Sequence, residues 1–340
     1  MLKTSEWVAL GHPDKMADYI SQCILDRYIS IDPGTRFAVE VMVKGNKVFL
    51  GGEVTSGAHL GKERIEEIVR QAVEQVGYSA EYADEWGREN CPCADSIEVF
   101  QEITSQSPDI AKGVNSDGWG DQGIFWGMAT PDEETGYMPK DIYLARKLGT
   151  ALYESCRCGI DIKTQVTVEG KTGEVAEVVV AAPEKEEEAG FLLETAQRVC
   201  GCDASTKIHI NGTGRYVRHG SVADCGVTGR KLAVDFYGGN SPIGGGAPWT
   251  KDGTKADLSL NLLAREIAIL EAIEANDTRR VALSCRIGSP EITAVLMDGA
   301  YNELRNWKRE LPPSKLIEKF HLNEPNFARI CRAGLCYYKS

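Results

Sequence analysis

Three stretches near the start of the chain decide the fold: PDKMADYISQCILDRYI (Pro13–Ile29), RFAVEVMVK (Arg36–Lys44) and VFLGGEVT (Val48–Thr55). Proline in the first turn and apolar residues at helical spacing predict a helix over the first stretch. The other two predict strands, and the turn KGNK (44–47) between them is typical of a hairpin. A helix followed by a hairpin predicts a small sheet with one face under a helix.

The same order of elements returns twice further along the chain. Each round is expected to contain a helix, a pair of strands and a further helix, which together can hide one face of a small sheet. The further expected elements are helix Lys62–Val76, ended by Gly77; helix Asp141–Cys156, strands Thr164–Val168 and Val175–Ala181, and helix Glu186–Val199; and helix Ala256–Ala275, strands Arg280–Ile287 and Ile292–Met297, and helix Leu316–Phe320. The pattern therefore predicts an α+β fold of three similar units.

The three units are expected to be partly interleaved along the chain. Residues 1–11 with 124–160, and residues 12–123, are expected to be parts of the first two units. Residues 161–236 are expected to form a further α+β unit. Residues 237–340 are expected to contain a glycine-rich loop and the last unit.

The composition is that of a globular protein long enough for more than one core, with 340 residues of which 42% are hydrophobic. Its 50 acidic and 38 basic residues give a formal charge of −12, a sign that repels nucleic acid and anionic membranes. The N-terminus lacks the apolar run of a signal peptide, and no stretch approaches the roughly 20 apolar residues of a membrane span. We therefore expect a cytoplasmic protein that binds neither nucleic acid nor membrane.

The cysteines do not predict a metal site. Eleven in a chain of this length are too few for a disulfide scaffold. Three pairs have the form Cys-x-Cys: Cys91 and Cys93, Cys156 and Cys158, and Cys200 and Cys202. Zinc and iron–sulfur sites need spacing such as Cys-x2-Cys, which is absent, so we interpret these cysteines as small buried apolar residues.

The pentapeptide Gly11-His12-Pro13-Asp14-Lys15 stands where the first predicted helix begins. A helix N-terminus has unpaired N–H groups that attract phosphate, and Asp14 can hold a hard cation. His12 and Lys15 can donate hydrogen bonds to phosphate oxygens. A plain helix start with proline and aspartate in its first turn is equally consistent with the pentapeptide alone.

A second segment, DCGVTGRK (224–231), places Arg230 and Lys231 directly behind a glycine. Glycine lets a backbone approach a phosphate closely, and the two basic side chains could bind it. The alternative is a solvated basic turn before a strand over the apolar run Leu232–Phe236.

A third segment, GGGAPWTKDGTKAD (244–257), joins a glycine loop to charged side chains. Lys251 and Lys255 could each bind a phosphate or carboxylate, and Asp257, at the start of a predicted helix, could hold a cation. Neither Walker A nor Rossmann spacing is present, so an ATP site in this chain would use a different cradle.

Two acidic residues fall on predicted strands, Glu40 and Glu53. A charge among apolar neighbours is costly unless it is paired, and Glu53 follows two glycines that could let a ligand come close. An outward-facing position at a sheet edge is the alternative for both. The glycine-rich segments 105–123 and 237–253 have no helix or strand pattern and are interpreted as functional loops.

Together these segments resemble methionine adenosyltransferase, also called S-adenosylmethionine synthetase, along nearly the whole chain. Seven segments follow the family's order: Ser5-Glu6 with Gly11–Lys15, Gly51–Thr55, Gln106–Ile110, Gly120–Gly123, Asn211–Tyr216, Asp224–Lys231, and Asp235–Gly239 with the glycine loop to Asp257. The family implies three similar α+β domains around a pseudo-threefold axis, with small mixed sheets covered by helices. It also implies a homodimer with shared active sites, often paired into a homotetramer.

The resemblance further implies the reaction and its residues. The family forms S-adenosylmethionine from ATP and L-methionine by attack of the sulfur on C5′ of ATP, and then hydrolyses the triphosphate to phosphate and pyrophosphate. It uses two Mg2+ and one K+. Matched by motif, the implied magnesium ligands are Asp14 and Asp257, and the implied potassium ligand is Glu40. The implied methionine-site residues are Glu53, Gln106, Asp121, Asp224 and Lys255. The implied ATP-site residues are His12, Asp161, Lys163, Arg215, Tyr216, Asp224, Arg230, Lys231, Ala247 and Lys251, of which His12, Lys163, Arg230 and Lys251 are the implied catalytic residues.

These residue types suit the reaction. A thioether sulfur is neutral and has no proton to lose, so no general base is needed. The enzyme must align the sulfur, C5′ and the leaving oxygen, and disperse the charge of the leaving triphosphate. His12 is then a donor to the triphosphate rather than a base, and Tyr216 offers a stacking face for adenine.

The chain also departs from the family. The segment 111–119 is shorter than the family's loop at this place, which normally gates the active site. Ile243 and Pro248-Trp249-Thr250 stand where the family usually has His and Phe-Ser-Gly. Two alternatives therefore stand beside the synthetase: a catalytically weak, ATP-binding regulatory homologue, and a triphosphate-cleaving relative with an altered thioether substrate. The full set of metal, phosphate and methionine residues favours the synthetase.

Overall fold

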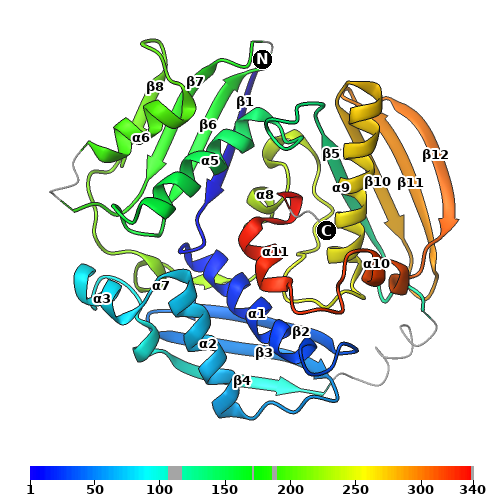
Figure 1. Ribbon diagram of the computed structural model, residues 1–340, viewed down its shortest axis with the longest axis horizontal. Coiled ribbons are helices and arrows are strands. Elements are labelled where there is room, and N and C mark those ends of the chain that lie inside the picture. Colours follow the sequence, from blue (N-terminus) through cyan, green and yellow to red (C-terminus); the bar gives the residue numbers. More distant parts are fainter. Residues whose placement is uncertain (106–116, 171, 186–189, 338–340) are drawn as a thin grey trace.

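The computed structural model describes residues 1–105, 117–170, 172–185 and 190–337. Its strands form three four-stranded sheets arranged around a common centre, with helices against one face of each (Figure 1). Two of the sheets contain parallel as well as antiparallel neighbours, and the third is antiparallel throughout. The predicted α+β class, with small sheets covered by helices, is confirmed.

The first sheet contains the helix and hairpin that open the sequence. Its strand order is β4-β3-β2-β9. The strands are β2 (Arg36–Lys44), β3 (Lys47–Thr55), β4 (Glu98–Thr104) and β9 (Gly226–Val227); the helices beside them are α1 (Pro13–Ile29), α2 (Lys62–Val76) and α3 (Ala80–Trp86). Helix α1 packs on β2 because its apolar residues, among them Met16, Ile20 and Ile24, are fully buried. Gly77 ends α2 at a φ of 110°, as the sequence predicts.

The second sheet joins the N-terminal strand to the middle of the chain. Its order is β1-β6-β7-β8. The strands are β1 (Leu2–Val8), β6 (Lys163–Glu169), β7 (Val175–Ala181) and β8 (Lys207–Ile210), under helices α5 (Lys140–Ser155) and α6 (Phe191–Cys200). Gly149 of α5 has no side chain where a Cβ would lie 2.2 Å from the Trp7 ring, so the ring can rest directly on the helix.

The third sheet closes the structure at the C-terminal side. Its order is β12-β11-β10-β5. The strands are β5 (Gly123–Ala129), β10 (Arg279–Cys285), β11 (Glu291–Asp298) and β12 (Glu303–Glu310), with helices α9 (Ala256–Ala275) and α10 (Pro313–Lys319). Helix α9 lies directly on β5 and β10.

Two strands do not belong to the units in which the sequence placed them. Residues 1–11 and 124–160 were expected to share a unit, and helix α5 does pack on β1. However, β1 pairs with β6, while β5 pairs with β10 of the third sheet. A strand pattern shows which side of a strand is buried but not which distant strand supplies its hydrogen bonds, so this boundary could not be placed from sequence.

Local expectations also changed at two places. The apolar run Leu232–Phe236 is not a strand, because Leu232–Asp235 forms the short helix α8. Helix α6 begins at Phe191 rather than at Glu186, and residues 186–189 lie outside the described part of the chain. Short helices α7 (Gly220–Ala223) and α11 (Phe327–Ala333) had no clear sequence signal.

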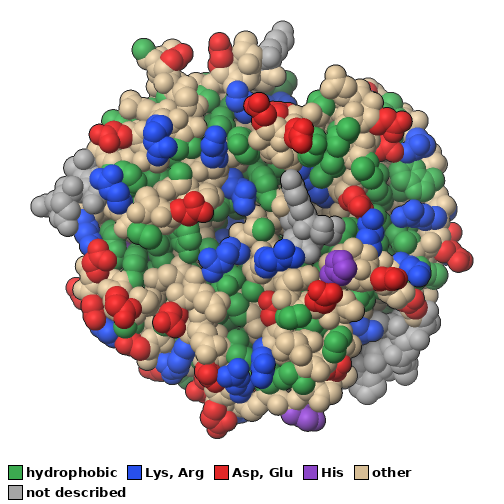
Figure 2. Space-filling view, in the orientation of Figure 1, with side chains coloured by type: hydrophobic (Ala, Val, Ile, Leu, Met, Phe, Trp, Pro, Cys, Tyr) green, Lys and Arg blue, Asp and Glu red, His purple; other side chains and the backbone are tan. Residues whose placement is uncertain are grey.

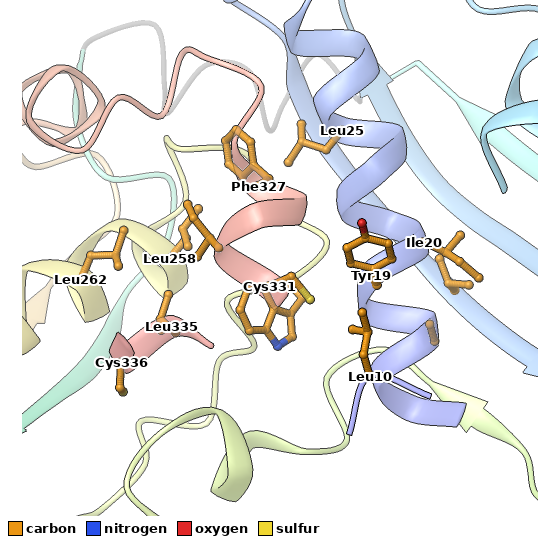
Figure 3. Close-up of a cluster of buried hydrophobic side chains, with 14 of the residues drawn as sticks. Leu10, Tyr19, Ile20, Leu25, Leu258, Leu262, Phe327, Cys331, Leu335 and Cys336 are labelled. Atoms are coloured by element: carbon orange, nitrogen blue, oxygen red, sulfur yellow. The ribbon is translucent and has the colours of Figure 1, made fainter. Parts of the chain in front are cut away.

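Helix α11 packs in the centre of the molecule. Figure 3 shows it between α1 and α9, with Phe327 and Cys331 among the apolar side chains of both helices. The carboxylate of Asp26 on α1 accepts hydrogen bonds from the backbone N–H groups of Phe327 and Ala328, at 2.8 and 2.9 Å. These bonds satisfy donors that a helix start leaves free, so α1 fixes where α11 begins. In the described ranges, no helix combines the length and apolar character that crossing a bilayer requires.

We expect Gly127→Ala to destabilise the fold. A Cβ at this position of β5 would lie 1.9 Å from the backbone oxygen of Ala264 on α9, so strand and helix would have to separate. Overpacking of this kind costs about 1–3 kcal/mol of unfolding free energy, which urea unfolding at a fixed protein concentration measures. Gly212→Ala is the matched control, because nothing lies within 4 Å of the Cβ it would add. Equal stability of the two variants would contradict this packing.

Candidate active site

His12 is the residue that caps helix α1. Its Nδ1 accepts a hydrogen bond from Asp14 N at 3.2 Å, and the side chain is almost fully buried. Burial, together with nearby Lys231 and Lys163, lowers the pKa of His12 to about 3. The ring is therefore neutral at physiological pH, and because Nδ1 accepts, Nε2 carries the proton. His12 can donate an N–H to a ligand but has no basic role to play.

Asp14 holds the segment 226–231 against the start of α1. Its Oδ1 accepts from Val227 N at 2.8 Å, its Oδ2 is bonded to the Lys231 ammonium, and the Arg230 guanidinium lies 3.8 Å away. Burial alone would raise the pKa of Asp14, but Lys231 and Val227 N–H outweigh it and lower the pKa. The carboxylate is therefore ionised and set among cations, as a metal- or phosphate-binding group requires.

Lys15 does not point toward a ligand. The sequence suggested that it could donate to phosphate, but the ammonium is buried and bonded to Asp18 at 3.0 Å and to Asp235 at 2.6 Å. It also lies 4.6 Å from the centroid of the Trp249 ring. Trp249 Nε1 donates to the other oxygen of Asp235 at 2.7 Å. Lys15 is thus a buried structural residue that links α1, α8 and the glycine loop.

Asp161 offers an unused acceptor near His12. Its Oδ2 accepts from Gly220 N at 2.9 Å, while its Oδ1 is buried with no hydrogen-bond partner among the described residues. Burial raises the pKa of Asp161 to about 6. Lys163 and Asp224, both exposed, lie close enough to act electrostatically on both Asp161 and His12. A buried oxygen without a partner is costly in the empty protein, and a ligand N–H or O–H would satisfy it.

Arg215 and Tyr216 lie at the border of this group. Arg215 is exposed, and its Nη1 donates to the backbone oxygen of Glu184 at 3.4 Å. The half-buried Tyr216 lies near Asp161, because the Asp161 charge helps to raise the pKa of the Tyr216 phenol, after burial as the main cause. His12, Asp14, Asp161, Lys163, Asp224, Arg230 and Lys231 form a first group, with Tyr216 beside Asp161 and Arg215 further out.

A second group surrounds the start of helix α9. Asp257, in the first turn, is bonded to the Lys251 ammonium. Gly246 passes so close that a Cβ there would lie 1.8 Å from Asp257 Oδ1. Lys255 pairs with the buried Asp252 at 3.2 Å, and Asp252 in turn accepts from Phe37 N on β2 at 2.8 Å. These contacts hold the glycine loop on the first sheet.

Glu40 lies between the two groups. It is exposed on β2, which has strands on both sides, so it is not at a sheet edge. Thr228, beside the first group, and Thr250, beside the second, both donate hydroxyl hydrogen bonds to its carboxylate. Thr250 has a φ of 70°, an unfavourable conformation for a β-branched residue, where the family usually has glycine. The charge on the strand is therefore paired, as the sequence required.

The remaining predicted site residues make fewer direct contacts with the two groups. Ala247 lies beside Gly229, where a Cβ would come within 2.9 Å of it, and Asp121 is near Asp257 because both act on Cys285. Glu53 is half-buried on β3. Gly52 before it does not open a path for a ligand, because a Cβ there would lie 2.0 Å from Ala38 O. Gln106 and the segment 111–116 lie outside the described residues.

The carboxylates fit hard cations, although the described residues contain no group of three or more metal-binding side chains. Magnesium keeps several waters and substrate phosphates and needs only one or two protein carboxylates. Asp14 and Asp257 can each supply one, and each already contacts a lysine ammonium. Glu40 with its two threonine hydroxyls offers oxygen ligands for a monovalent cation.

Comparisons with known proteins agree with this fold. The chain matches the N-terminal (residues 1–108), central (116–216) and C-terminal (219–338) domains of S-adenosylmethionine synthetase. It is 34% identical to S-adenosylmethionine synthase of Brachyspira hyodysenteriae and 39% identical to S-adenosylmethionine synthase 1 of Rhodospirillum rubrum, each over 97% of this chain and 92% of the relative. A solved structure described as an unusual S-adenosylmethionine synthetase from Campylobacter jejuni superposes with a TM-score of 0.87, at 33% identity, over 98% of this chain and 94% of that one.

The fold and site define a three-domain α+β protein with a centre that contains both carboxylates and basic side chains. The chain belongs to the S-adenosylmethionine synthetase family.

Several residues that hold the site had no signal in the sequence. They are Asp18, Thr228, Asp235, Trp249, Thr250 and Asp252. Each is an ordinary polar or aromatic residue whose role depends on a partner up to 220 positions away. All but Asp18 lie within the motif segments recognised in the sequence, but nothing in those segments showed which partner each would have.

We expect Asp161→Asn to make the ligand-free protein more stable at pH 7. The pKa of Asp161 is raised from 3.8 to about 6, so the folded state keeps a proton that the unfolded state releases. The stability of the protonated form is fully present below pH 3.8 and is lost as pH rises through 6, by at most about 3 kcal/mol. Urea unfolding from pH 4 to 7 should therefore show an advantage of the variant that shrinks toward pH 4. Substitution of the exposed Glu133 by Gln is the control, and a pH-independent advantage of Asp161→Asn would exclude this explanation.

Proposed function

We propose that this protein forms S-adenosylmethionine from ATP and L-methionine, and then cleaves the triphosphate to phosphate and pyrophosphate. The observation that carries the proposal is the set of cations around Asp14 and His12 at the start of α1, with the orphaned acceptor of Asp161 beside them. Membership of the S-adenosylmethionine synthetase family supports the same activity.

The reaction needs positioning and charge dispersal rather than proton removal. Methionine sulfur is neutral, so its attack on C5′ of ATP releases no proton. Negative charge develops on the oxygen that leaves with the triphosphate, and preorganised donors stabilise it best. The neutral His12, with Nε2–H as its donor, suits that oxygen, while Lys163, Arg230 and Lys251 suit the rest of the triphosphate.

ATP recognition is assigned to the first group and the glycine loop. Asp161 Oδ1 would accept a hydrogen bond from the nucleoside, and the Tyr216 ring would stack on adenine. Arg215, Lys231 and Ala247 would complete the contacts. Methionine is assigned to Glu53, Gln106, Asp121 and Lys255, with Asp224 between both substrates. The opposite charges in this set match the ammonium and carboxylate of an amino acid.

Two Mg2+ and one K+ would complete the site. Asp14 and Asp257 would each hold a magnesium ion, and Glu40 with Thr228 and Thr250 would hold the potassium ion. When bound, these ions neutralise phosphate charge and orient the phosphates. Before they bind, Lys231 and Lys251 balance the two aspartates, so substrate binding can exchange these internal ion pairs for contacts to phosphate.

We also propose a homodimer with active sites shared between chains. Direct bonds in one chain leave Asp14 and Asp257 in separate groups, each paired to its own lysine. The face of the first sheet away from α1 carries exposed apolar side chains, Met42 and Phe100, with Phe100 stacked on Phe49 at 5.0 Å. Such a patch is typical of an interface between subunits. Pairing of dimers into a tetramer would be visible in the mass of the particle.

No disulfide joins any of the eleven cysteines, which suits a reducing cytoplasm as the place of the reaction. The deciding experiment incubates the purified protein with ATP, methionine, Mg2+ and K+, and measures S-adenosylmethionine and phosphate. ATP binding without product would favour the regulatory homologue, and phosphate without S-adenosylmethionine would favour a triphosphate-cleaving relative. Neither alternative is favoured by the comparisons.

We expect His12→Ala to lower kcat by about 100- to 1000-fold, as the loss of one preorganised donor to a developing charge usually does. The KM for methionine should change little, because His12 faces the triphosphate. Steady-state kinetics measure both values. His209→Ala, at an exposed histidine paired with Glu177, is the control and should retain full activity. Unchanged kcat in His12→Ala would remove His12 from the reaction.

A mixed dimer tests the shared site. Asp14→Asn and Asp257→Asn should each abolish most activity as homodimers. If one site takes Asp14 from one chain and Asp257 from the other, a mixed dimer contains one intact site and should have about half of the wild-type activity per dimer. Two affinity tags isolate this species. If each chain supplies both residues to its own site, every site in the mixed dimer is damaged and the activity stays low.

A further inference from the structure

A cavity of about 240 Å3 lies where the three α+β units meet. Its walls come from β1, α1, α5, α8 and α11, which surround the centre of the molecule in Figure 1. In Figure 2, Lys and Arg side chains gather around the middle of the same face. None of the residues assigned to ATP, methionine or metal ions lines this cavity, so it is a separate feature of the fold.

Arg146 of α5 brings an unpaired positive charge to this cavity. One of its nitrogens donates to Ala333 O at 2.6 Å, and the guanidinium stacks on the Tyr337 ring at 3.9 Å. No carboxylate lies within ion-pair distance among the described residues. Two acids lie on the same helix: the buried Asp141, which accepts hydrogen bonds from two other side chains, and the exposed Glu154, eight residues or about 12 Å further along the axis. Burial lowers the pKa of Arg146, which is the electrostatic consequence of a desolvated cation without a partner.

The other basic groups of the cavity are differently placed. Lys15 is bonded to two carboxylates, those of Asp18 and Asp235, so it adds no positive charge to the cavity. Arg332 is exposed and donates to Tyr19 Oη at 3.3 Å and to Gln75 O at 2.9 Å, with no carboxylate partner among the described residues. Among the described residues, Arg146 and Arg332 are therefore the cations of the cavity without a carboxylate partner, and Arg146 is the more buried of the two. A guanidinium has five N–H donors and binds carboxylates in a planar, bidentate way.

Part of the wall is apolar. The Trp7 ring rests on α5 at Gly149, and Leu10 and Val234 lie beside it. A cavity with a buried guanidinium that lacks a carboxylate partner among the described residues, beside apolar and aromatic side chains, suits a compact ligand that is anionic at one end. Glu154, which also lines the cavity, disfavours ligands with more than one negative charge.

We propose that this cavity binds a small organic monoanion, a carboxylate with a compact apolar body. The Arg146 guanidinium binds the carboxylate, and Trp7, Leu10 and Val234 contact the apolar body. The site lies directly behind the residues assigned to catalysis. Its floor includes Lys15, next to Asp14, and Asp235, which ends the short helix that follows Lys231. A ligand that presses on the Lys15–Asp235 pair therefore changes the KM for ATP.

Benzoate is the probe, and benzamide is its neutral match of the same shape. Calorimetric titration of the full chain should give saturable benzoate binding near about 1 mM, the affinity expected for so few atoms, and no benzamide binding at the same concentrations. Arg146→Met should weaken benzoate binding at least tenfold. Lys147→Met is the matched control: it removes a charge one residue away, on an exposed side chain outside the cavity, and should leave binding unchanged.

A second variant covers the case in which Arg146→Met fails to fold. Thr150→Phe fills the cavity from α5 without changing charge and should also abolish binding. Equal binding of benzoate and benzamide, or benzoate binding that survives both substitutions, would overturn the proposed site. The KM for ATP, measured with and without saturating benzoate, should shift at least threefold in wild type and not in Arg146→Met. Binding at Arg146 with an unchanged KM would keep the site and refute its coupling to catalysis.

Discussion

The rest of the structure depends on one buried ion pair network, in which Lys15 of α1 holds Asp18 and Asp235. Asp235 also accepts from Trp249, so a single ammonium fixes the first helix, the helix after Lys231 and the glycine loop relative to one another. Breaking a buried pair of this kind leaves an uncompensated charge, which is among the costliest changes a core can suffer. The network therefore sets the distance between elements that are far apart in the sequence and that carry the chemistry.

Charges that are balanced by neighbouring groups also determine the protonation states within the site. His12 is kept neutral by burial and by neighbouring cations, and Asp14 is kept ionised by Lys231. Each proposed metal-binding aspartate contacts a lysine, and Asp161 keeps one oxygen without a partner. The two aspartates thus have fixed partners before ligands arrive, while the one free oxygen of Asp161 has no partner among the described residues. Preorganisation of this kind is what a reaction that only has to align neutral sulfur and disperse triphosphate charge requires.

Local sequence patterns predicted a large part of this fold. Turn residues, caps and apolar spacing act over a few residues, and they predict the bounds of several elements. These elements are the first helix, strand Arg36–Lys44 and the helices 62–76 and 256–275. These local signals do not predict the pairing of β1 with β6 or of β5 with β10, because hydrogen bonds between distant strands leave no local pattern. Exposed edge strands such as Glu303–Glu310, with charges on both sides, carry too little periodicity to be recognised.

The sequence by itself determined the class of fold and the family, because motifs of glycine, lysine and aspartate are specific when seven occur in order, and it supplied the residues proposed for the site. Only the tertiary structure decided what Lys15 does. In the pentapeptide Gly11–Lys15 it looks like a phosphate ligand, but folding buries it against carboxylates from two other segments. Glu40 is a similar case, since the threonine hydroxyls that pair it come from positions 228 and 250. The physical reason is the same in both cases. Burial and packing decide which group pairs with a charge, and the neighbouring residues in the sequence do not reveal either of them.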